Sequence, residues 1–450
     1  NRQTEAVAEL QSAGIDARWI APVEPDCLLE GHSVAVDDGR IVALLPTCET
    51  RDRFSARERV ELANHLLIPG LVNLHTHAAM SLMRGLADDL PLMDWLEKHI
   101  WPAEAAHVSA DFVAAGTRLA CAEMLLGGIT CFNDMYFFPE AAAHAATTLG
   151  MRAVLGITAI EFPTAYASDA DDYLAKGLAA QDRWRNHPLI RFCLAPHAPY
   201  TVSDKTFERI ATLAAQLQLP IHCHIHETQA EISGSLERFG CRPLERLDRL
   251  GLVGPGLLAV HAVHLETGEI DLLARYGASV AHCPASNLKL ASGIAPIAAM
   301  VAAGINVGLG TDGAASNNRL DLFSEMRLAA LLAKGTSGDA AALPARQALR
   351  MATLGGARAL GMEAEIGSLA VGKAADLCAV DFSDPTTHPC YDPISHLVYV
   401  AGREQVSHVW VGGNCCVTGK VISGLNLDEL ENSVRLWQNR VQIRPGIAIL

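Results

Sequence analysis

The first strand of the predicted fold reads Ile68-Pro69-Gly70-Leu71-Val72-Asn73-Leu74 and runs directly into His75-Thr76-His77. A nearly uninterrupted apolar run of this kind is typical of a strand that is buried on both faces, as in a parallel sheet. Residues two apart on a strand face the same side, so the imidazoles of His75 and His77 can point at one ion. Two histidines near a strand end can equally be polar residues of the rim, and this pair alone does not decide between the two interpretations.

Seven further strand-like runs follow the first and alternate with amphipathic, helix-like stretches. The runs cover residues 129–133, 153–159, 190–195, 221–225, 257–261, 278–282 and 306–310. Helical periodicity is clearest over residues 110–126, 204–217, 267–276 and 320–333. Eight strand-plus-helix units predict an α/β fold with a closed (β/α)8 TIM barrel rather than an open doubly wound sheet. No G-x-G-x-x-G follows the first strand, so a dinucleotide-binding fold has no local support.

The two ends of the chain differ from this middle, because they carry short β-type pieces. Residues 33–36 and 40–45 are separated by Asp37-Asp38-Gly39, which predicts a hairpin since Asp-Gly tolerates the positive φ of a tight turn. Short strands are predicted again at residues 377–381 and 406–411. Two β-rich ends therefore flank the barrel.

Composition excludes several classes of protein. The 450 residues are 50% hydrophobic and 19% charged, which is too apolar for a disordered chain. A formal net charge of −15 argues against nucleic acid as a partner, because a phosphate backbone selects a basic face. The one long charge-free run, 290–311, is interrupted by glycine and proline, so we interpret it as a buried helix followed by a buried strand rather than a membrane span.

Cysteine usage predicts the compartment. The 12 cysteines include no C-x-x-C pair, and residues 1–10 show neither the basic nor the apolar region of a secretory leader. A reducing cytoplasm is the simplest interpretation, with most thiols acting as small buried hydrophobes.

The fifth strand carries three more histidines, in Ile221-His222-Cys223-His224-Ile225-His226-Glu227. Strand alternation puts His222, His224 and His226 on one face, so spacing alone does not choose a ligand. A ligand near the strand end with a carboxylate three residues later fits His224 and Glu227 best. His222 is then expected to be packed or to support a ligand, and His226 to lie on the rim.

The remaining strand ends complete a polar cluster. The sixth and seventh strands end in His261 and His282, and the eighth is followed by Asp312. Asp312 alone could be a turn-forming or helix-capping residue, but with histidines at the same barrel end a metal ligand is the better interpretation. Imidazoles with a carboxylate suit Zn²⁺, with Fe²⁺ as a competitor, and a bound metal lowers the pKa of its water towards ~7. Glu227 and Asp312 can then transfer protons while His261 orients or polarises, which predicts metal-assisted hydrolysis.

Four motifs resemble those of the amidohydrolase superfamily: residues 69–77, His224-Ile225-His226-Glu227-Thr228, His282-Cys283-Pro284-Ala285-Ser286-Asn287 and Gly310-Thr311-Asp312-Gly313. Residues 367–377 are similar to the point where that superfamily re-enters its β-sandwich. The resemblance implies a distorted barrel over residues 67–365 and a small β-sandwich built from residues 1–66 and 366–450. It also implies one metal per subunit, zinc with iron as the alternative, held by His75, His77, His224 and Asp312.

Residues 78–92 resemble the loop after the first strand in the 5′-methylthioadenosine/S-adenosylhomocysteine deaminase group. The resemblance implies that Trp95 packs near a nucleoside and that Glu104 binds its ribose hydroxyls. Without the resemblance, Trp95 would be interpreted as a core aromatic and Glu104 as a surface residue. The resemblance further implies substrate contacts from Arg152, His197, Glu227 and Ser316. The long connection over residues 78–107 is expected to act as a partial lid.

The implied reaction is hydrolytic deamination of a 6-aminopurine nucleoside to the inosine analogue and ammonia. In it water attacks C6, Asp312 takes the water proton, Glu227 protonates ring N1, and His261 helps polarise the water. No arginine in residues 162–176 is available to pair an amino-acid carboxylate, which favours methylthioadenosine over S-adenosylhomocysteine; adenosine is a further candidate. The Pro-Cys-x-x-Cys signature of cytidine-type deaminases is absent after Pro389.

Two alternatives remain. Another deaminase or hydrolase of the superfamily would act on guanine, 8-oxoguanine or a triazine, and a free base has no ribose for Glu104 to bind. A non-catalytic, hydantoinase-like assembly protein would have lost metal ligands, whereas all four are present here. A homo-oligomer is expected by analogy only.

Overall fold

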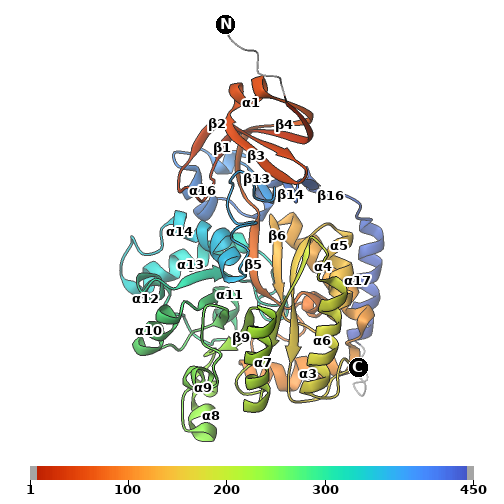
Figure 1. The fold of residues 1–450 in the computed structure, drawn as a ribbon, viewed down its shortest axis with the longest axis vertical. Helices are drawn as coiled ribbons and strands as arrows, with labels where there is room; N and C mark the ends of the chain where they lie inside the picture. The colour runs from red at the N-terminus through yellow and green to blue at the C-terminus, as the bar shows by residue number, and fades with distance from the viewer. Residues whose placement is uncertain (1–7, 443–450) are drawn as a thin grey trace.

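The computed structural model describes residues 8–442 and consists of two eight-stranded sheets with helices around one of them (Figure 1). In this view the red strands of the N-terminal part lie at the top, and the barrel lies below them. Residues 1–7 and 443–450, at the outer ends of the two expected end segments, lie outside the described residues. Most of the N-terminal stretch that was expected to contain no secretory leader is among them.

The barrel sheet contains eight parallel strands, each hydrogen-bonded to the next in chain order. This confirms the predicted fold, and each predicted strand coincides with an observed one apart from small shifts at the ends. The strands are β5 (Leu71–Thr76), β6 (Ile129–Asp134), β7 (Arg152–Ala159), β8 (Ile190–Pro196), β9 (Ile221–Ile225), β10 (Leu257–His261), β11 (Ser279–His282) and β12 (Asn306–Leu309).

The first and last strands of the barrel meet through glycines. The N–H of Asp312 donates to the carbonyl of His75 at 2.9 Å, just beyond the end of β12. A Cβ added to Gly310 would lie 2.8 Å from the backbone nitrogen of His75, so only glycine permits this approach. The closing contact therefore brings Asp312 beside the two histidines of β5.

Helices connect the strands and cover the barrel. Three have the predicted limits: α4 (Ala110–Leu126), α7 (Asp204–Leu217) and α10 (Thr267–Tyr276). The prediction for residues 290–311 is also confirmed, because α12 (Ile297–Ala302) precedes β12 there. The others are α5 (Pro139–Thr148), α6 (Ala170–Trp184), α8 (Gln229–Phe239), α9 (Pro243–Arg249), α11 (Pro284–Lys289), α13 (Leu322–Ser337), α14 (Ala345–Arg350), α15 (Gly356–Ala359), α16 (Pro393–Tyr399) and α17 (Leu427–Gln442). Over residues 8–442, no helix has the length and apolar character that crossing a bilayer requires.

The second sheet combines both ends of the chain, as expected. Its order is β16-β15-β14-β13-β4-β1-β2-β3. The strands are β1 (Ala8–Ile20), β2 (Leu29–Asp37), β3 (Arg40–Pro46), β4 (Phe54–Pro69), β13 (Leu377–Asp381), β14 (Val406–Val411), β15 (Asn414–Thr418) and β16 (Val421–Ile422). The predicted hairpin is confirmed as β2 and β3, with Asp38 and Gly39 at φ 46° and 75°.

The two halves of this sheet close on each other as the layers of a sandwich do. Ala375 links them, since its N–H donates to Gly39 at 2.8 Å and its carbonyl accepts from Gly413 at 3.0 Å. Apolar side chains from both halves, among them Val34 and Trp410, form one buried cluster. The expected limit at residue 66 falls inside β4, which continues to Pro69 before β5 starts the barrel.

Candidate metal centre and active site

Four side chains from three strand ends converge on one point at the carboxyl end of the barrel. Nε2 of His75 and Nε2 of His77 both lie 3.2 Å from Oδ1 of Asp312. Nε2 of His224, from β9, lies 3.2 Å from Nε2 of His75. A tetrahedral zinc ion with bonds of about 2.0–2.1 Å separates its ligand atoms by roughly 3.3–3.4 Å. His75, His77 and Asp312 form one group whose ligand atoms lie within 4.8 Å of one another, and His224 joins this group through His75. The distances between these neighbouring donor atoms match zinc.

Hydrogen bonds to the second ring nitrogen orient two of these histidines. Nδ1 of His77 donates to the carbonyl of Met135 at 2.6 Å, and Nδ1 of His224 donates to the carbonyl of His197 at 2.7 Å. A proton on Nδ1 leaves the lone pair of Nε2 free for a metal. The rings are held with their ligand atoms facing inward before any ion arrives.

Burial and mutual contact set the protonation of the cluster. Burial lowers the pKa of His75 to about 4 and the pKa of His224 well below its usual value. Burial opposes ionisation of Asp312, but hydrogen bonds with His75 and His77 hold its pKa well below its ordinary range. For His77, burial lowers the pKa, yet contact with Asp312 outweighs it and raises the pKa to about 9. Positive charge is thus stabilised at the point where a metal ion would sit.

Glu227 and His261 border the ligand cluster. Oε1 of Glu227 lies 3.6 Å from Nε2 of His261, which in turn lies 3.9 Å from Oδ2 of Asp312. Burial raises the pKa of Glu227, which favours a carboxyl group that carries a proton. Nδ1 of His261 donates to Oδ1 of Asn287 at 2.8 Å, so its Nε2 faces the site.

Three residues at these strand ends have left-handed backbone conformations. His226, His261 and Asp312 have φ values of 56°, 75° and 60°. Such angles are uncommon for residues other than glycine, and they concentrate at functional sites where the fold over-determines them. The strain re-aims the chain at the strand ends, which is where the reactive side chains lie.

A pocket joins this cluster to the connection after β5. That connection contains η1 (Ala78–Met83), α2 (Leu92–Trp95), η2 (Leu96–Ile100) and α3 (Trp101–His107), and it roofs the pocket. Trp95 and Glu104 both line the pocket, together with His197, Glu227 and His261. Oε1 of Glu104 accepts a hydrogen bond from the Tyr136 hydroxyl at 2.8 Å. The expected nucleoside-binding residues therefore share a pocket with the expected metal ligands.

Residues 66–416 match the amidohydrolase family. The chain belongs to this family. The 5-methylthioadenosine/S-adenosylhomocysteine deaminase of Saccharophagus degradans is 49% identical over 95% of this chain and 96% of its own length. The protein with the same name from Teredinibacter turnerae is 48% identical over 95% of this chain and 97% of its own length.

Solved structures extend this likeness. An adenosine deaminase from Xanthomonas campestris with bound zinc is 50% identical, with a TM-score of 0.96, and the match covers 97% of this chain and 100% of that chain. An atrazine chlorohydrolase from Arthrobacter aurescens complexed with zinc is 26% identical, with a TM-score of 0.88, over 95% of this chain and 100% of the other. Zinc is therefore present in similar structures, in agreement with the donor set found here.

In this amidohydrolase, Arg152 lies at the wrong end of the barrel for a substrate contact. It is the first residue of β7, whereas the site lies beyond the last residues of the strands. Its guanidinium binds Asp376 through bonds of 2.9 and 3.0 Å and also contacts Glu365. The expectation that Arg152 reaches substrate is wrong, because parallel strands begin at the face opposite the site. Arg152 instead joins the barrel to the second sheet.

Ser316 lies behind Asp312 rather than in the pocket wall. Its hydroxyl donates to the carbonyl of Gly313 at 3.1 Å and accepts from the Ser286 hydroxyl at 3.2 Å. Ser286 in turn lies 2.6 Å from Oδ2 of Asp312 and donates to it. The expected direct substrate contact of Ser316 is not supported, and its place is that of a support for Asp312.

The roles of the other histidines follow from their positions along the strands and from their contacts. His222 supports a ligand, as expected, since its Nε2 lies 2.8 Å from Nδ1 of His75. His226 was expected on the rim, but it is fully buried, and its Nε2 accepts from the N–H of Leu244 at 2.9 Å. His282 is buried and is not among the described groups that could hold a metal.

Sequence reasoning missed Tyr136, Ser286 and Asn287, which hold Glu104, Asp312 and His261 in place. Tyr136 lies two residues after the end of β6, and a polar residue just past a strand end of the barrel could have been predicted to face the site. Ser286 and Asn287 lie within a quoted motif, but only their contacts assign them a role.

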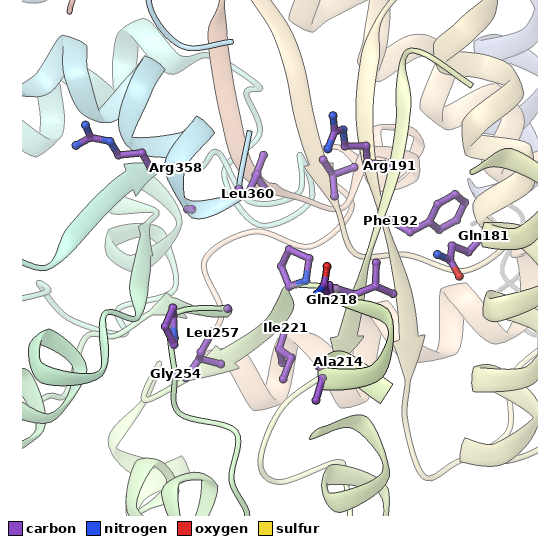
Figure 2. A pocket seen from close by; sticks show the side chains of 18 of the residues that line it. Gln181, Arg191, Phe192, Ala214, Gln218, Ile221, Gly254, Leu257, Arg358 and Leu360 are labelled. Atoms are coloured by element: carbon purple, nitrogen blue, oxygen red, sulfur yellow. The ribbon is translucent and has the colours of Figure 1, made fainter. Parts of the chain in front are cut away.

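A second hollow lies at the opposite, amino-terminal ends of the strands (Figure 2). Figure 2 shows Arg191 and Arg358 on different sides of it, above Ile221 and Leu257, which begin β9 and β10. Arg191 binds Glu365, and Arg358 lies 3.3 Å from a carboxylate oxygen of Glu24. This hollow is separate from the metal ligands and holds none of the described metal-binding groups.

Proposed function

We propose that the protein hydrolyses the 6-amino group of an adenosine-type nucleoside, with 5′-methylthioadenosine as the preferred substrate, to give the inosine analogue and ammonia. One observation carries the proposal: a single pocket, lined by the metal-ligand side chains His77, His224 and Asp312 and by Glu227, also reaches Glu104 and Trp95. The deaminase names of the relatives from Saccharophagus degradans and Teredinibacter turnerae support it. All four ligands are present, which argues against a non-catalytic assembly protein.

Zinc held by His75, His77, His224 and Asp312 would supply a Lewis acid and a water of lowered pKa when bound. Burial raises the pKa of Glu227 and so favours its protonated form, from which it can donate a proton to ring N1 of the purine. Asp312 is the carboxylate that accepts the proton of the attacking water, and Ser286 steadies its Oδ2. His261 faces both carboxylates and orients the water between them.

The connection after β5, which covers the pocket, supplies the residues proposed to bind the nucleoside. The Glu104 carboxylate can accept hydrogen bonds from the two ribose hydroxyls while Tyr136 holds its other side. Trp95 supplies an apolar face for the purine or ribose. Trp101 and Phe162 pack edge to face with ring centroids 5.4 Å apart and line an adjoining apolar space that also reaches Glu104.

The apolar space favours a small uncharged 5′-substituent. Among the described residues that line it and the metal pocket there is no lysine or arginine. The carboxylate of S-adenosylhomocysteine would lose water there without gaining a cationic partner, which is costly. A methylthio group has no such cost, so methylthioadenosine is preferred over S-adenosylhomocysteine.

An ammonia-release assay on zinc-loaded enzyme tests the proposal with methylthioadenosine, adenosine, S-adenosylhomocysteine, guanine and 8-oxoguanine. Methylthioadenosine should give the highest kcat/KM. A Glu104→Ala variant should raise KM for nucleosides, since it removes the ribose contact. Turnover of guanine or 8-oxoguanine without turnover of any adenosine analogue would replace this proposal with the free-base alternative.

Several finer expectations stay proposals. We propose zinc rather than iron as the resident metal, because three imidazoles and one carboxylate match tetrahedral zinc. A small-molecule substrate without nucleic-acid or membrane partners is consistent with the net charge of −15. A cytoplasmic location is consistent with twelve cysteines, none of them paired. Homo-oligomerisation rests on analogy with the family, and the domain limits 67 and 366 rest on the resemblance.

A further inference from the structure

A helix-capping glutamate, Glu231, lies directly behind the backbone of Glu227. Thr228 caps α8, since its Oγ1 accepts a hydrogen bond from the N–H of Glu231 at 3.2 Å. In an ordinary capping box, the glutamate at this position returns to the N–H of the cap residue. Here the carboxylate reaches further back: Oε2 accepts from the N–H of Glu227 at 2.7 Å, and Oε1 accepts from the N–H of His226 at 3.1 Å.

The carboxylate of Glu231 thus fills a small anion site made by the chain itself. Consecutive backbone N–H groups that point into one space form such a site. Glu231 is only 7% exposed, so water cannot easily replace it as the acceptor. Burial raises the pKa of Glu231, and the N–H groups of Glu227, His226 and Thr228 lower it; because both oxygens accept hydrogen bonds, the contacts are those of the ionised form.

The turn that Glu231 holds is otherwise fixed through His226. His226 has a left-handed backbone with φ 56°. Its Nδ1 donates to the carbonyl of His264 at 3.0 Å, and its carbonyl accepts from the N–H of His264 at 3.0 Å. On the Glu227 side, the backbone N–H donates to the carboxylate of Glu231. The peptide between His226 and Glu227 is therefore held at its carbonyl by the N–H groups of Val263 and His264 and at its N–H by Glu231.

We infer that Glu231 is a positioning residue, which holds the backbone of Glu227 so that the Glu227 carboxyl faces the pocket beside His261. The inference rests on the proposed function, because it takes Glu227 as the proton donor. Without Glu231, the two N–H groups would have to turn towards other acceptors, and the peptide of Glu227 would turn with them. A displacement of about 1 Å at a reacting group can reduce a rate by about 100-fold.

Zinc-loaded Glu231→Ala and Glu231→Gln variants test the inference with methylthioadenosine. The amide oxygen of glutamine can keep one of the two hydrogen bonds, so its loss should be the smaller. We expect kcat to fall about 10- to 100-fold in Glu231→Ala and less in Glu231→Gln, with KM and bound zinc close to wild type. The matched control is Asp169→Ala, which removes the cap of α6 at 2.8 Å but lies at an exposed position outside the pocket.

Formate provides a readout that a merely structural role would not change. A cavity beside Glu231, lined also by Thr228, Ser235 and Phe239, gives a small anion access to the vacated N–H groups. Formate should restore kcat of Glu231→Ala at least about fivefold, while chloride at equal ionic strength should not. Formate should not restore kcat of Glu227→Gln, because the glutamine amide still occupies the position of the Glu227 carboxyl group.

The outcomes distinguish failure of the inference from failure of the proposed function. If Glu231→Ala keeps kcat within about twofold of wild type, or loses it without rescue by formate, the inference is wrong. If the variant binds less zinc, or if its KM rises while kcat falls, Glu231 supports the whole site, and the specific role of positioning Glu227 is also wrong. If Glu227→Gln keeps full activity, or the wild type deaminates no adenosine analogue, the proposed function fails and the inference falls with it.

Discussion

The hydroxyl of Tyr136 donates a hydrogen bond of 2.8 Å to Oε1 of Glu104, and this contact joins the end of β6 to the roof of the pocket. Both side chains line the pocket that contains the metal ligands. Glu104 belongs to α3, none of whose residues is fully buried. Tyr136 therefore holds the carboxylate that is proposed to bind ribose.

A Tyr136→Phe variant should raise KM for methylthioadenosine about 10- to 150-fold while changing kcat little. The lost hydrogen bond is to a charged group, and such bonds contribute about 1.5–3 kcal/mol. The measurement is a steady-state comparison with Tyr276→Phe, which alters a tyrosine that is 41% exposed on α10. A change in kcat alone would mean that Tyr136 acts on the chemistry rather than on ribose binding.

Binding should strengthen as the pH rises through 7. Burial raises the pKa of Glu104 to about 7, so the group is mostly protonated below that pH and ionised above it. The ionised carboxylate accepts hydrogen bonds from both ribose hydroxyls and from Tyr136, whereas the protonated form loses acceptor capacity. KM should therefore fall between about pH 6 and pH 8, and Glu104→Gln should abolish this dependence while leaving the profile of kcat unchanged. A KM profile that Glu104→Gln leaves intact would assign the dependence to another group.

Removal of the metal should abolish activity and weaken the fold. Without a cation, the buried Asp312, His75 and His224 and the partly buried His77 share a small space, and only protons balance the charge of the carboxylate. Dialysis against a zinc chelator should reduce turnover to below about 1% and lower Tm, and about one equivalent of zinc should restore both. Full activity in chelated protein with no detectable metal would refute the metal centre.

Loss of Arg152 should reduce stability rather than substrate binding. Arg152 and Asp376 are each 3% exposed, and removing one partner leaves a buried charge without compensation. Arg152→Met should lower the free energy of unfolding by about 3–5 kcal/mol in urea titrations, with KM near wild type. The double variant Arg152→Met/Asp376→Asn should recover part of the loss. A raised KM with unchanged stability would return Arg152 to the substrate site.

Strand alternation and chain order were sufficient to predict most of the architecture. The parallel strands are buried on both faces, so their sequences are continuously apolar, and the helices between them repeat with helical period. Parallel strands in a barrel also bring their carboxyl ends to one face, which is why His75, His77, His224 and Asp312 could be grouped in advance. The same rule, applied to Arg152 at the start of a strand, would have placed it at the far face.

The sequence by itself determined the barrel, the chain-end sheet and the residue types of the metal centre, because these follow from local periodicity and strand direction. Only the tertiary structure decided among His222, His224 and His226, because His222 and His224 share one face of β9 with different neighbours and His226 lies just past its end. It also decided that Glu231 anchors Glu227 and that Tyr136 holds Glu104. Those contacts join a side chain to a partner that local pattern does not specify, since they depend on the final packing of the loops at the strand ends.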